Sequence, residues 1–250
     1  MSLSRPLPKV IGHRGAAARA PENTLAGLRT AAALGAGMVE FDTKLTGDGV
    51  PILLHDSLVD RTTDGSGPVR DMGLAAVRAL DAGAWFGPGF AGEPVPTLAQ
   101  ALSLALRLGL AVNIEIKPCD GREVETAEAA LAVAAQVWPA DRPAPLVSSY
   151  SREALRAVRR IRPDWPRGLL FGTPPADWMA QVDDLAPATI NVSQRRLTAD
   201  RVARLRAAGR PVLAYTVNDP ARARALFDIG VAAVFTDAPD TILAGLGDGV

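Results

Sequence analysis

The chain has 250 residues, of which 48% are hydrophobic, and its 27 Lys and Arg side chains are balanced by 27 Asp and Glu. This length suits a single α/β barrel domain, and the balanced charge argues against a broad nucleic-acid-binding surface. Cys119 is the single cysteine, which excludes an internal disulfide. No signal-peptide pattern and no apolar run of roughly 20 residues, the length of a membrane span, is found. We therefore expect a cytoplasmic protein without stable membrane association.

Short strands alternate with Ala-, Leu- and Arg-rich helices along the chain. Strands are expected at 10–12, 39–43, 112–116, 146–148, 168–171, 190–192, 212–216 and 234–236. Helices are expected at 24–34, 98–108, 123–137, 152–161, 177–185, 199–208 and 221–228, with a short one after Pro239. Asn23, Asp219 and Asp237 are the expected N-cap residues. The alternation predicts an α/β fold of the TIM (β/α)₈ barrel type; a doubly wound open sheet is the alternative, but no glycine-rich dinucleotide fingerprint is present.

One segment interrupts this alternation. Gly47-Asp48-Gly49 joins the strand 39–46 to a second extended run, 50–54. The connection is too short for a parallel crossover, so it predicts an antiparallel hairpin. Residues 57–96 are then rich in Gly, Pro and Asp and include the pair Trp85-Phe86. We expect a small cap at 57–96, inserted after the hairpin into a single barrel domain that covers residues 1–250.

Charged side chains occur within two of the expected strands. Glu40 and Asp42 stand two residues apart and share one face of their strand, and Glu115 and Lys117 repeat this spacing. Such residues are unusual in buried parallel strands, which normally read as continuous apolar runs. Surface edge strands with one polar face are the alternative. In a barrel, these strands would deliver their charged groups to the C-terminal mouth, where barrel enzymes have their active sites.

The two histidines of the chain each follow a short apolar strand. His13 is followed by Arg14, and His55 by Asp56. Histidine transfers protons in either direction near neutral pH, so an acid/base pair is expected, with packed or surface histidines as the alternative. A hairpin loop of even length would place His55 opposite Glu40 or Asp42, whereas an odd length would turn it to the other face.

The three carboxylates Glu40, Asp42 and Glu115 would raise one another's pKa unless a cation neutralised them. Oxygen ligands suit one divalent ion, Mg²⁺ or Ca²⁺. Together with Arg14 and Lys117, such an ion would form a site for a phosphate group. Histidines beside it could take a proton from a nucleophile and give one to a leaving oxygen. The pattern predicts metal-assisted cleavage of a phosphodiester.

Short motifs run through nearly the whole chain in order. They are Ile11-Gly12-His13-Arg14-Gly15, Pro21-Glu22-Asn23-Thr24, Val39-Glu40-Phe41-Asp42, Leu54-His55-Asp56 and Ile114-Glu115-Ile116-Lys117. Further ones are Asp60-Arg61-Thr62-Thr63, Val95-Pro96-Thr97-Leu98, Tyr215-Thr216-Val217-Asn218 and Phe235-Thr236-Asp237-Ala238-Pro239. Together they resemble the motifs of the glycerophosphodiester phosphodiesterases, in their cytoplasmic bacterial form.

The resemblance implies a TIM barrel with a small insertion that hydrolyses glycerophosphodiesters, such as glycerophosphocholine or glycerophosphoethanolamine, to sn-glycerol 3-phosphate and an alcohol. By motif position, the implied roles are metal ligation by Glu40, Asp42 and Glu115, acid/base catalysis by His13 and His55, and phosphate contact by Arg14 and Lys117. Tyr215, where the family often has tryptophan, is expected in the pocket wall. Phe86 is expected on the glycerol side, with a place in the insertion's own core as the alternative.

Several alternatives stay open at this point. Either water attacks the phosphorus directly, or the neighbouring glycerol hydroxyl attacks first and gives a cyclic phosphate. The rival functions are a membrane-lipid phospholipase of the same superfamily and a catalytically silent barrel that binds a phosphodiester. The sequence does not distinguish Mg²⁺ from Ca²⁺, the roles of the two histidines or the preferred head group, and a homodimer is left open.

Overall fold

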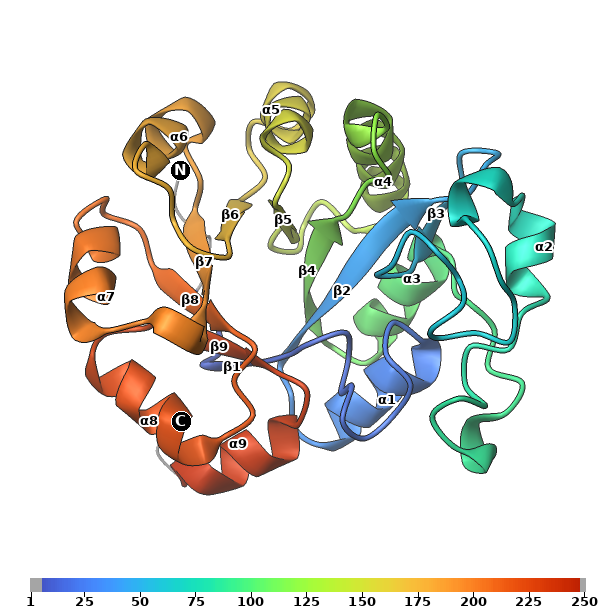
Figure 1. Cartoon of the computed structure of the whole chain (residues 1–250), viewed down its shortest axis with the longest axis horizontal. Coiled ribbons are helices and arrows are strands. Elements are labelled where there is room, and N and C mark those ends of the chain that lie inside the picture. Colours follow the sequence, from blue (N-terminus) through green and yellow to red (C-terminus); the bar gives the residue numbers. More distant parts are fainter. Residues whose placement is uncertain (1–5, 248–250) are drawn as a thin grey trace.

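In the computed structural model, which describes residues 6–247, parallel strands close into a barrel with the helices on its outside (Figure 1). The strands are β1 (Val10–Gly12), β2 (Met38–Leu45), β3 (Pro51–Leu53), β4 (Ala111–Ile116), β5 (Leu146–Ser149), β6 (Arg167–Phe171), β7 (Thr189–Ser193), β8 (Val212–Tyr215) and β9 (Ala233–Thr236). Their order around the barrel is β1-β9-β8-β7-β6-β5-β4-β2, and a β1–β2 pairing closes the ring. The expected TIM barrel is confirmed.

The helices are α1 (Leu25–Ala33), α2 (Leu74–Arg78), α3 (Leu98–Arg107), α4 (Glu123–Val137), α5 (Arg152–Ile161), α6 (Trp178–Leu185), α7 (Ala199–Arg206), α8 (Pro220–Asp228) and α9 (Pro239–Leu246). Asp219 caps α8 as expected, by accepting a hydrogen bond from the backbone of Ala221. The other two expected caps are wrong: the side chain of Thr24 caps α1, and Ala238, which has no capping side chain, precedes α9. Asn23 and Asp237 are thereby free for other contacts. Within residues 6–247, no helix combines the length and apolar character needed to cross a membrane.

The hairpin formed by β2 and β3 has the odd register. Thr43 pairs with Leu53 and Leu45 with Pro51, and Thr46 donates its backbone N–H to Val50 at 3.1 Å. Three residues therefore form the turn, and Gly49 takes the left-handed conformation (φ 81°) that such loops require. Of the two registers that the sequence left open, the hairpin has the odd one, so strand pairing does not place His55 opposite Glu40 or Asp42.

His55 nevertheless reaches the barrel mouth, because β3 ends at Leu53 and the pairing rule no longer applies beyond it. The backbone N–H of Leu54 donates to the carbonyl of Asp42 at 3.1 Å, which keeps the chain beside β2. The chain then bends at His55. The bend after β3, and not the pairing of the two strands, therefore brings His55 to the mouth of the barrel.

The segment 57–96 lies at one side of the barrel, to the right in Figure 1. It contains α2 and the short 3₁₀ helices η1 (Val69–Asp71) and η2 (Pro88–Phe90). Its apolar side chains form a cluster with two residues of the hairpin and with Cys119; the buried members are Ile52, Leu54, Val59, Val69, Val77, Ala82, Val95 and Cys119. The segment thus packs on the barrel through a shared core.

The barrel interior changes from apolar to polar along its axis. Ile11, Met38, Leu146, Leu213 and Phe235 pack together. Alternation along a strand points every second residue inward, so the barrel strands also bring buried polar residues inside; among these are Asn113 on β4, Ser148 on β5 and Asn191 on β7. Most of the apolar core lies between the strands and the outer helices, in two large clusters. Tight packing outside the barrel holds the strand ends at the mouth in fixed positions.

Candidate active site

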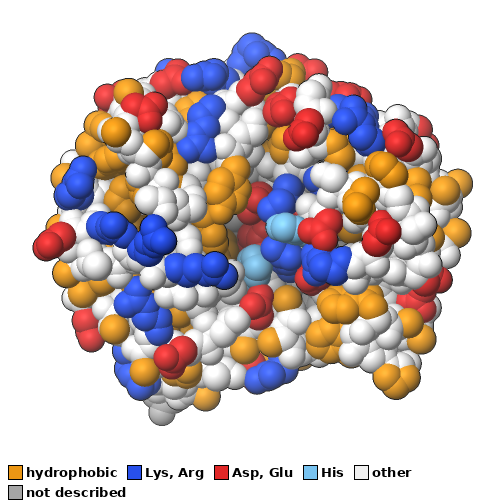
Figure 2. Space-filling view, in the orientation of Figure 1, with side chains coloured by type: hydrophobic (Ala, Val, Ile, Leu, Met, Phe, Trp, Pro, Cys, Tyr) orange, Lys and Arg blue, Asp and Glu red, His pale blue; other side chains and the backbone are white. Residues whose placement is uncertain are grey.

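The carboxyl ends of the strands surround a cavity of about 400 Å³. Figure 2 shows it as a hollow in which acidic, basic and histidine side chains meet. The lining residues are His13, Arg14, Glu40, Asp42, His55, Asn113, Glu115, Lys117, Tyr150, Leu170, Gly172, Ser193, Gln194, Arg195, Tyr215, Thr216 and Phe235. Every predicted catalytic, phosphate-binding and metal-ligating residue is in this set, as is Tyr215.

Glu40, Asp42 and Glu115 form an acidic triad at the base of the cavity. Asp42 on β2 and Glu115 on β4 are direct partners in the parallel ladder, and Glu40 lies two residues before Asp42 on the same face. One carboxylate oxygen from each lies within 4.8 Å of the other two, and all three side chains are buried. Hard divalent cations prefer such oxygen donors, so the triad could hold one.

The electrostatics of the triad fit a bound cation. Burial and then the charge of Asp42 raise the pKa of Glu40 to about 8, and the same two causes raise the pKa of Glu115. Burial acts in the same direction on Asp42, but Arg14 and Lys117 outweigh it and lower the pKa of that carboxyl to about 2. Oε1 of Glu40 is buried without a hydrogen-bond partner among the described residues. Buried carboxylate oxygens are normally paired or bound to metal, so these residues fit a divalent ion.

Arg14 and Lys117 lie on the cavity side of the triad. Nε of Arg14 is 3.2 Å from Oδ2 of Asp42, and the backbone N–H of Arg14 donates to Glu40 at 2.9 Å. Nζ of Lys117 is 3.5 Å from Asp42 and 3.3 Å from Glu115. Two positive groups beside three carboxylates neutralise only part of the charge, so the site retains capacity for a further cation.

His13 is held by a carboxylate from the opposite end of the chain. Because β1 pairs with β9, the backbone N–H of His13 donates to Thr236, which places the next residue, Asp237, beside the imidazole. Nδ1 of His13 is 2.6 Å from Oδ1 of Asp237, and Asn218 donates to the other Asp237 oxygen at 2.7 Å. Burial opposes protonation, but Asp237 and Glu40 outweigh it and raise the pKa of His13.

His55 is oriented in the same way by its neighbour. Nδ1 of His55 is 2.5 Å from Oδ1 of Asp56, whose other oxygen accepts from Nε of Arg61 at 2.6 Å. Burial, together with the charge of Arg14, lowers the pKa of His55. The two imidazoles therefore have pKa values displaced in opposite directions, which is typical of an acid and a base at one site. Neither Nε2 atom hydrogen-bonds to another described residue.

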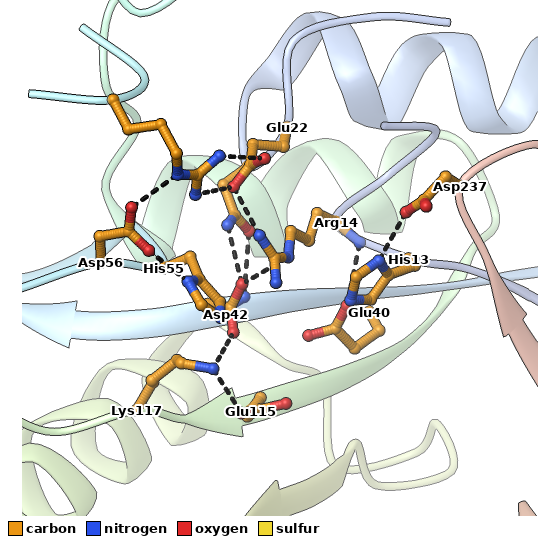
Figure 3. A network of polar contacts seen from close by, with 12 residues as sticks. His13, Arg14, Glu22, Glu40, Asp42, His55, Asp56, Glu115, Lys117 and Asp237 are labelled. Atoms are coloured by element: carbon orange, nitrogen blue, oxygen red, sulfur yellow. Dashed lines mark hydrogen bonds and ion pairs between the residues drawn. The ribbon is translucent and has the colours of Figure 1, made fainter. Parts of the chain in front are cut away.

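The two histidine positions are connected through Glu22 (Figure 3). Glu22 accepts two hydrogen bonds from Arg61, both at 2.8 Å, and one from Arg14 at 2.7 Å. Burial opposes ionisation, but the two guanidinium groups lower the pKa of Glu22. This chain of charged contacts fixes Arg14 in place and links the residues after β1 to the insertion.

The predicted pocket aromatics have different positions. Tyr215 lines the cavity; its hydroxyl donates to the carbonyl of Phe171 at 2.7 Å and contacts the hydroxyl of Tyr150. Phe86 is not a lining residue: its ring packs edge-on against Trp85 at 5.7 Å and Phe90 at 5.5 Å, between centroids. The predicted contact of Phe86 with substrate stays a prediction.

Four supporting residues received no role at the site in the sequence analysis, where Asn23 and Asp237 were expected only as helix caps: Glu22, Asn23, Lys44 and Asp237. Asn23 donates to Asp42 at 2.9 Å and accepts from its backbone N–H at 3.0 Å. The buried Nζ of Lys44 donates to the carbonyl of Lys117 at 2.9 Å. The position of Asp237 directly after the last strand was a usable signal, because that strand neighbours the first in a closed barrel. Glu22 and Asn23 follow no strand, and only the loop conformation brings them to the mouth.

The mouth of the barrel combines an acidic triad, two imidazoles that contact aspartates, and the positive side chains of Arg14 and Lys117. This combination defines the class of TIM-barrel phosphodiester hydrolases. The model of the glycerophosphoryl diester phosphodiesterase family matches residues 13–241. The chain therefore belongs to this family of enzymes.

Curated and solved relatives agree with this assignment. The glycerophosphodiester phosphodiesterase of Caldanaerobacter subterraneus subsp. tengcongensis is 32% identical over 234 residues, which are 94% of this chain and 96% of the relative. A Bacillus subtilis glycerophosphodiester phosphodiesterase is 34% identical over 251 residues, which cover 92% of this chain and 83% of the relative. A solved relative is an Oleispira antarctica phosphodiesterase in complex with the product sn-glycerol-3-phosphate. It matches this chain with a TM-score of 0.93 and 39% identity, and the match covers 96% of this chain and 97% of the Oleispira chain.

Proposed function

We propose that the protein hydrolyses glycerophosphodiesters to sn-glycerol 3-phosphate and an alcohol, with one divalent ion, Mg²⁺ or Ca²⁺, held by Glu40, Asp42 and Glu115. The observation that carries the proposal is the convergence of these carboxylates with His13 and His55 in one cavity. The product named with the Oleispira relative, which shares the fold over nearly its whole length, supports the same substrate class.

Arg14 and Lys117 bind the phosphodiester in this proposal. Both line the cavity beside the triad, and each is fixed by carboxylates, so their positions are set before substrate arrives. Fixed positive charges stabilise the negative charge that develops on the phosphoryl oxygens, at little cost in reorganisation. The bound divalent ion supplies Lewis-acid stabilisation of that same charge.

His13 and His55 perform the proton transfers. In each ring, the aspartate contact fixes Nδ1 and the ring plane, which leaves Nε2 to exchange a proton with substrate. One imidazole accepts the proton of the attacking oxygen, and the other donates a proton to the departing alkoxide. The attacking oxygen belongs either to water or to the glycerol hydroxyl next to the phosphate; in the second case water then opens a cyclic phosphate.

The test follows release of glycerol 3-phosphate from glycerophosphocholine and glycerophosphoglycerol. We expect activity to be lost with a chelator and restored by Mg²⁺ or Ca²⁺. Glu40→Gln and Glu115→Gln should each lower kcat/KM by about a hundredfold or more, because the ion would lose a charged ligand. Glu128→Gln, in an exposed ion pair with Arg160 on the outer helices, is the matched control. Full activity with chelator present and in both ligand variants would refute the metal-assisted mechanism, and binding of a diester without turnover would indicate a silent barrel.

A further inference from the structure

A second cavity, of about 250 Å³, adjoins the catalytic one. It lies between the segment that follows β6 and the segment formed by η3 (Gln194–Arg196) and α7. Gly172 and Ser193 line both cavities, so the two share a border. A substrate whose phosphodiester lies at the triad could extend one of its two ester arms across this border.

Arginine side chains concentrate at this border. Arg196, Arg201 and Arg204 line the second cavity, and Arg195 lines the catalytic cavity beside it. We call these four residues the arginine cluster. All four are exposed, and none takes part in an ion pair within residues 6–247. Figure 2 shows Lys and Arg side chains reaching from the region of η3 and α7 toward the hollow. Because the whole chain has equal numbers of acidic and basic residues, this local excess does not follow from composition.

Acidic residues near the second cavity do not cancel this charge. No Asp or Glu is among its described lining residues. Asp177, just before α6, accepts a hydrogen bond from Gln181 at 3.1 Å, and its field acts on Arg152. Asp200 lies in the first turn of α7 and forms no ion pair with the cluster. The second cavity is therefore a positively charged extension of a cavity whose base is negative.

The cavity wall offers little to a positively charged head group. A quaternary ammonium group is normally bound by the faces of several aromatic rings. The aromatic lining residues are Tyr150, Tyr215 and the buried Phe235 in the catalytic cavity, and the buried Trp178 in the second cavity. The Nζ of Lys117 lies over the ring of Tyr150, 5.9 Å from its centroid, and the two tyrosine rings meet edge to face. A choline group would thus compete with Lys117 for one ring and would face Arg195.

We propose that the arginine cluster is a subsite for a negatively charged group on the alcohol half of the diester, so that the enzyme prefers glycerophosphodiesters whose head group carries a phosphate. The inference rests on the proposed function and adds the substrate class. Guanidinium groups bind phosphate through charge-assisted, often bidentate hydrogen bonds, which suits a second phosphate next to the one being cleaved.

The experiment compares two substrates that differ by one phosphate, glycerophosphoinositol 4-phosphate and glycerophosphoinositol. The readout is the ratio of their kcat/KM values, from which the fraction of folded enzyme cancels. We expect a wild-type ratio on the order of ten at low ionic strength, falling as salt screens the exposed charges. In the double variant Arg196→Gln and Arg204→Gln, the ratio should fall to about one, within a factor of two. Arg201 is kept, because it donates a hydrogen bond to the carbonyl of Arg196.

Arg29→Gln is the matched control, because Arg29 is an exposed arginine of α1 that lines neither cavity. It should keep the wild-type ratio. A wild-type ratio near one, or a ratio unchanged in the double variant, would overturn the subsite. If the double variant no longer bound anionic phospholipid vesicles but kept the wild-type ratio, the arginine cluster would be assigned to a lipid surface. That result would also overturn the proposed subsite. Failure to hydrolyse either substrate would instead count against the proposed function.

Discussion

At the scale of single residues, each proposed catalytic group depends on a partner that fixes it. His13 has Asp237, His55 has Asp56, and Arg14 has Glu22, all at 2.5–2.7 Å. Such partners decide the tautomer of a histidine and the direction of its free nitrogen. The proposed chemistry therefore depends on residues that are not expected to touch the phosphate.

We expect His13→Gln to lower kcat by about a hundredfold or more and Asp237→Asn by roughly tenfold to a hundredfold. The asparagine cannot hold His13 in one tautomer or stabilise its protonated form, whereas KM should change little. Steady-state kinetics on glycerophosphoglycerol measure both effects. Asp240→Asn, which alters an exposed ion pair with Arg19, serves as the control and should stay within about twofold of wild type. Wild-type kcat in Asp237→Asn would show that this carboxylate has no positioning role.

Glu22 should make the stability of the fold depend on pH. Its pKa is lower in the folded protein than its ordinary value of 4.5, because Arg61 and Arg14 outweigh the effect of burial. The ionised form therefore stabilises the folded state above about pH 4.5, and this contribution is lost as the pH falls below it. We expect Glu22→Gln to lower the free energy of unfolding by about 1.5–3 kcal/mol at pH 7.

Urea unfolding of both proteins at several pH values measures this contribution. The difference in the free energy of unfolding between wild type and Glu22→Gln should shrink as the pH falls from 5 toward 3. A difference that is the same at pH 7 and pH 3 would mean that the ionised carboxylate contributes nothing specific.

At the scale of elements, the turn that follows β1 positions His13 and Arg14. A Cβ atom on Gly12 would lie 2.2 Å from the carbonyl oxygen of Gly15, so the turn closes only over a glycine. Gly15 in turn donates its backbone N–H to Glu40 on β2 at 3.2 Å. The turn thus joins β1 to β2, the strand of Glu40 and Asp42, and places His13 between them.

Gly12→Ala should lower the free energy of unfolding by about 1–3 kcal/mol, since the clash is with backbone atoms that cannot move aside. The activity of the folded fraction should also fall, because His13 is the next residue. Gly89→Ala is the matched control: a Cβ there meets nothing within 4 Å. The control should be neutral, or more stable by up to about 1 kcal/mol. Equal stability of the two variants in urea unfolding would refute this account of the turn.

At the scale of the whole molecule, the segment 57–96 and the barrel share their core. Ile52 and Leu54 of the hairpin pack in the same cluster as Val69 and Val77 of the segment. The segment also supplies the contact between Arg61 and Glu22 that reaches the cavity. Because part of this cluster belongs to the barrel, the apolar residues of the segment lose some of their burial once the barrel unfolds.

We therefore expect one cooperative unfolding transition. Trp85 reports on the segment, while Trp138, Trp165 and Trp178 report on the barrel. Urea unfolding is followed by fluorescence in wild type and in Trp85→Phe, and by far-ultraviolet circular dichroism in wild type. All three transitions should have the same midpoint and slope. An earlier transition that disappears in Trp85→Phe would show that the segment unfolds separately.

Local patterns were sufficient to predict much of this protein. Alternating apolar strands and helices predicted the barrel, and the two-residue spacing of Glu40 and Asp42 predicted a shared inner face, because side-chain direction in a strand depends only on position along it. The short motifs, taken together, were sufficient to indicate the family. Each of these predictions depends on residues that are close in sequence, or on a local pattern that recurs along the chain.

Tertiary structure decided what depends on residues far apart in the chain. The pairing of β1 with β9 brings Asp237 to His13, and the loop after β1 brings Asn23 to Asp42. The hairpin has the odd one of the two registers that the sequence left open, and a bend after β3 carries His55 to the cavity. The four residues of the arginine cluster are close in sequence, but only the fold places them at the border of two cavities, opposite the segment that follows β6. Closure of the barrel sets these distances, and no local pattern encodes them.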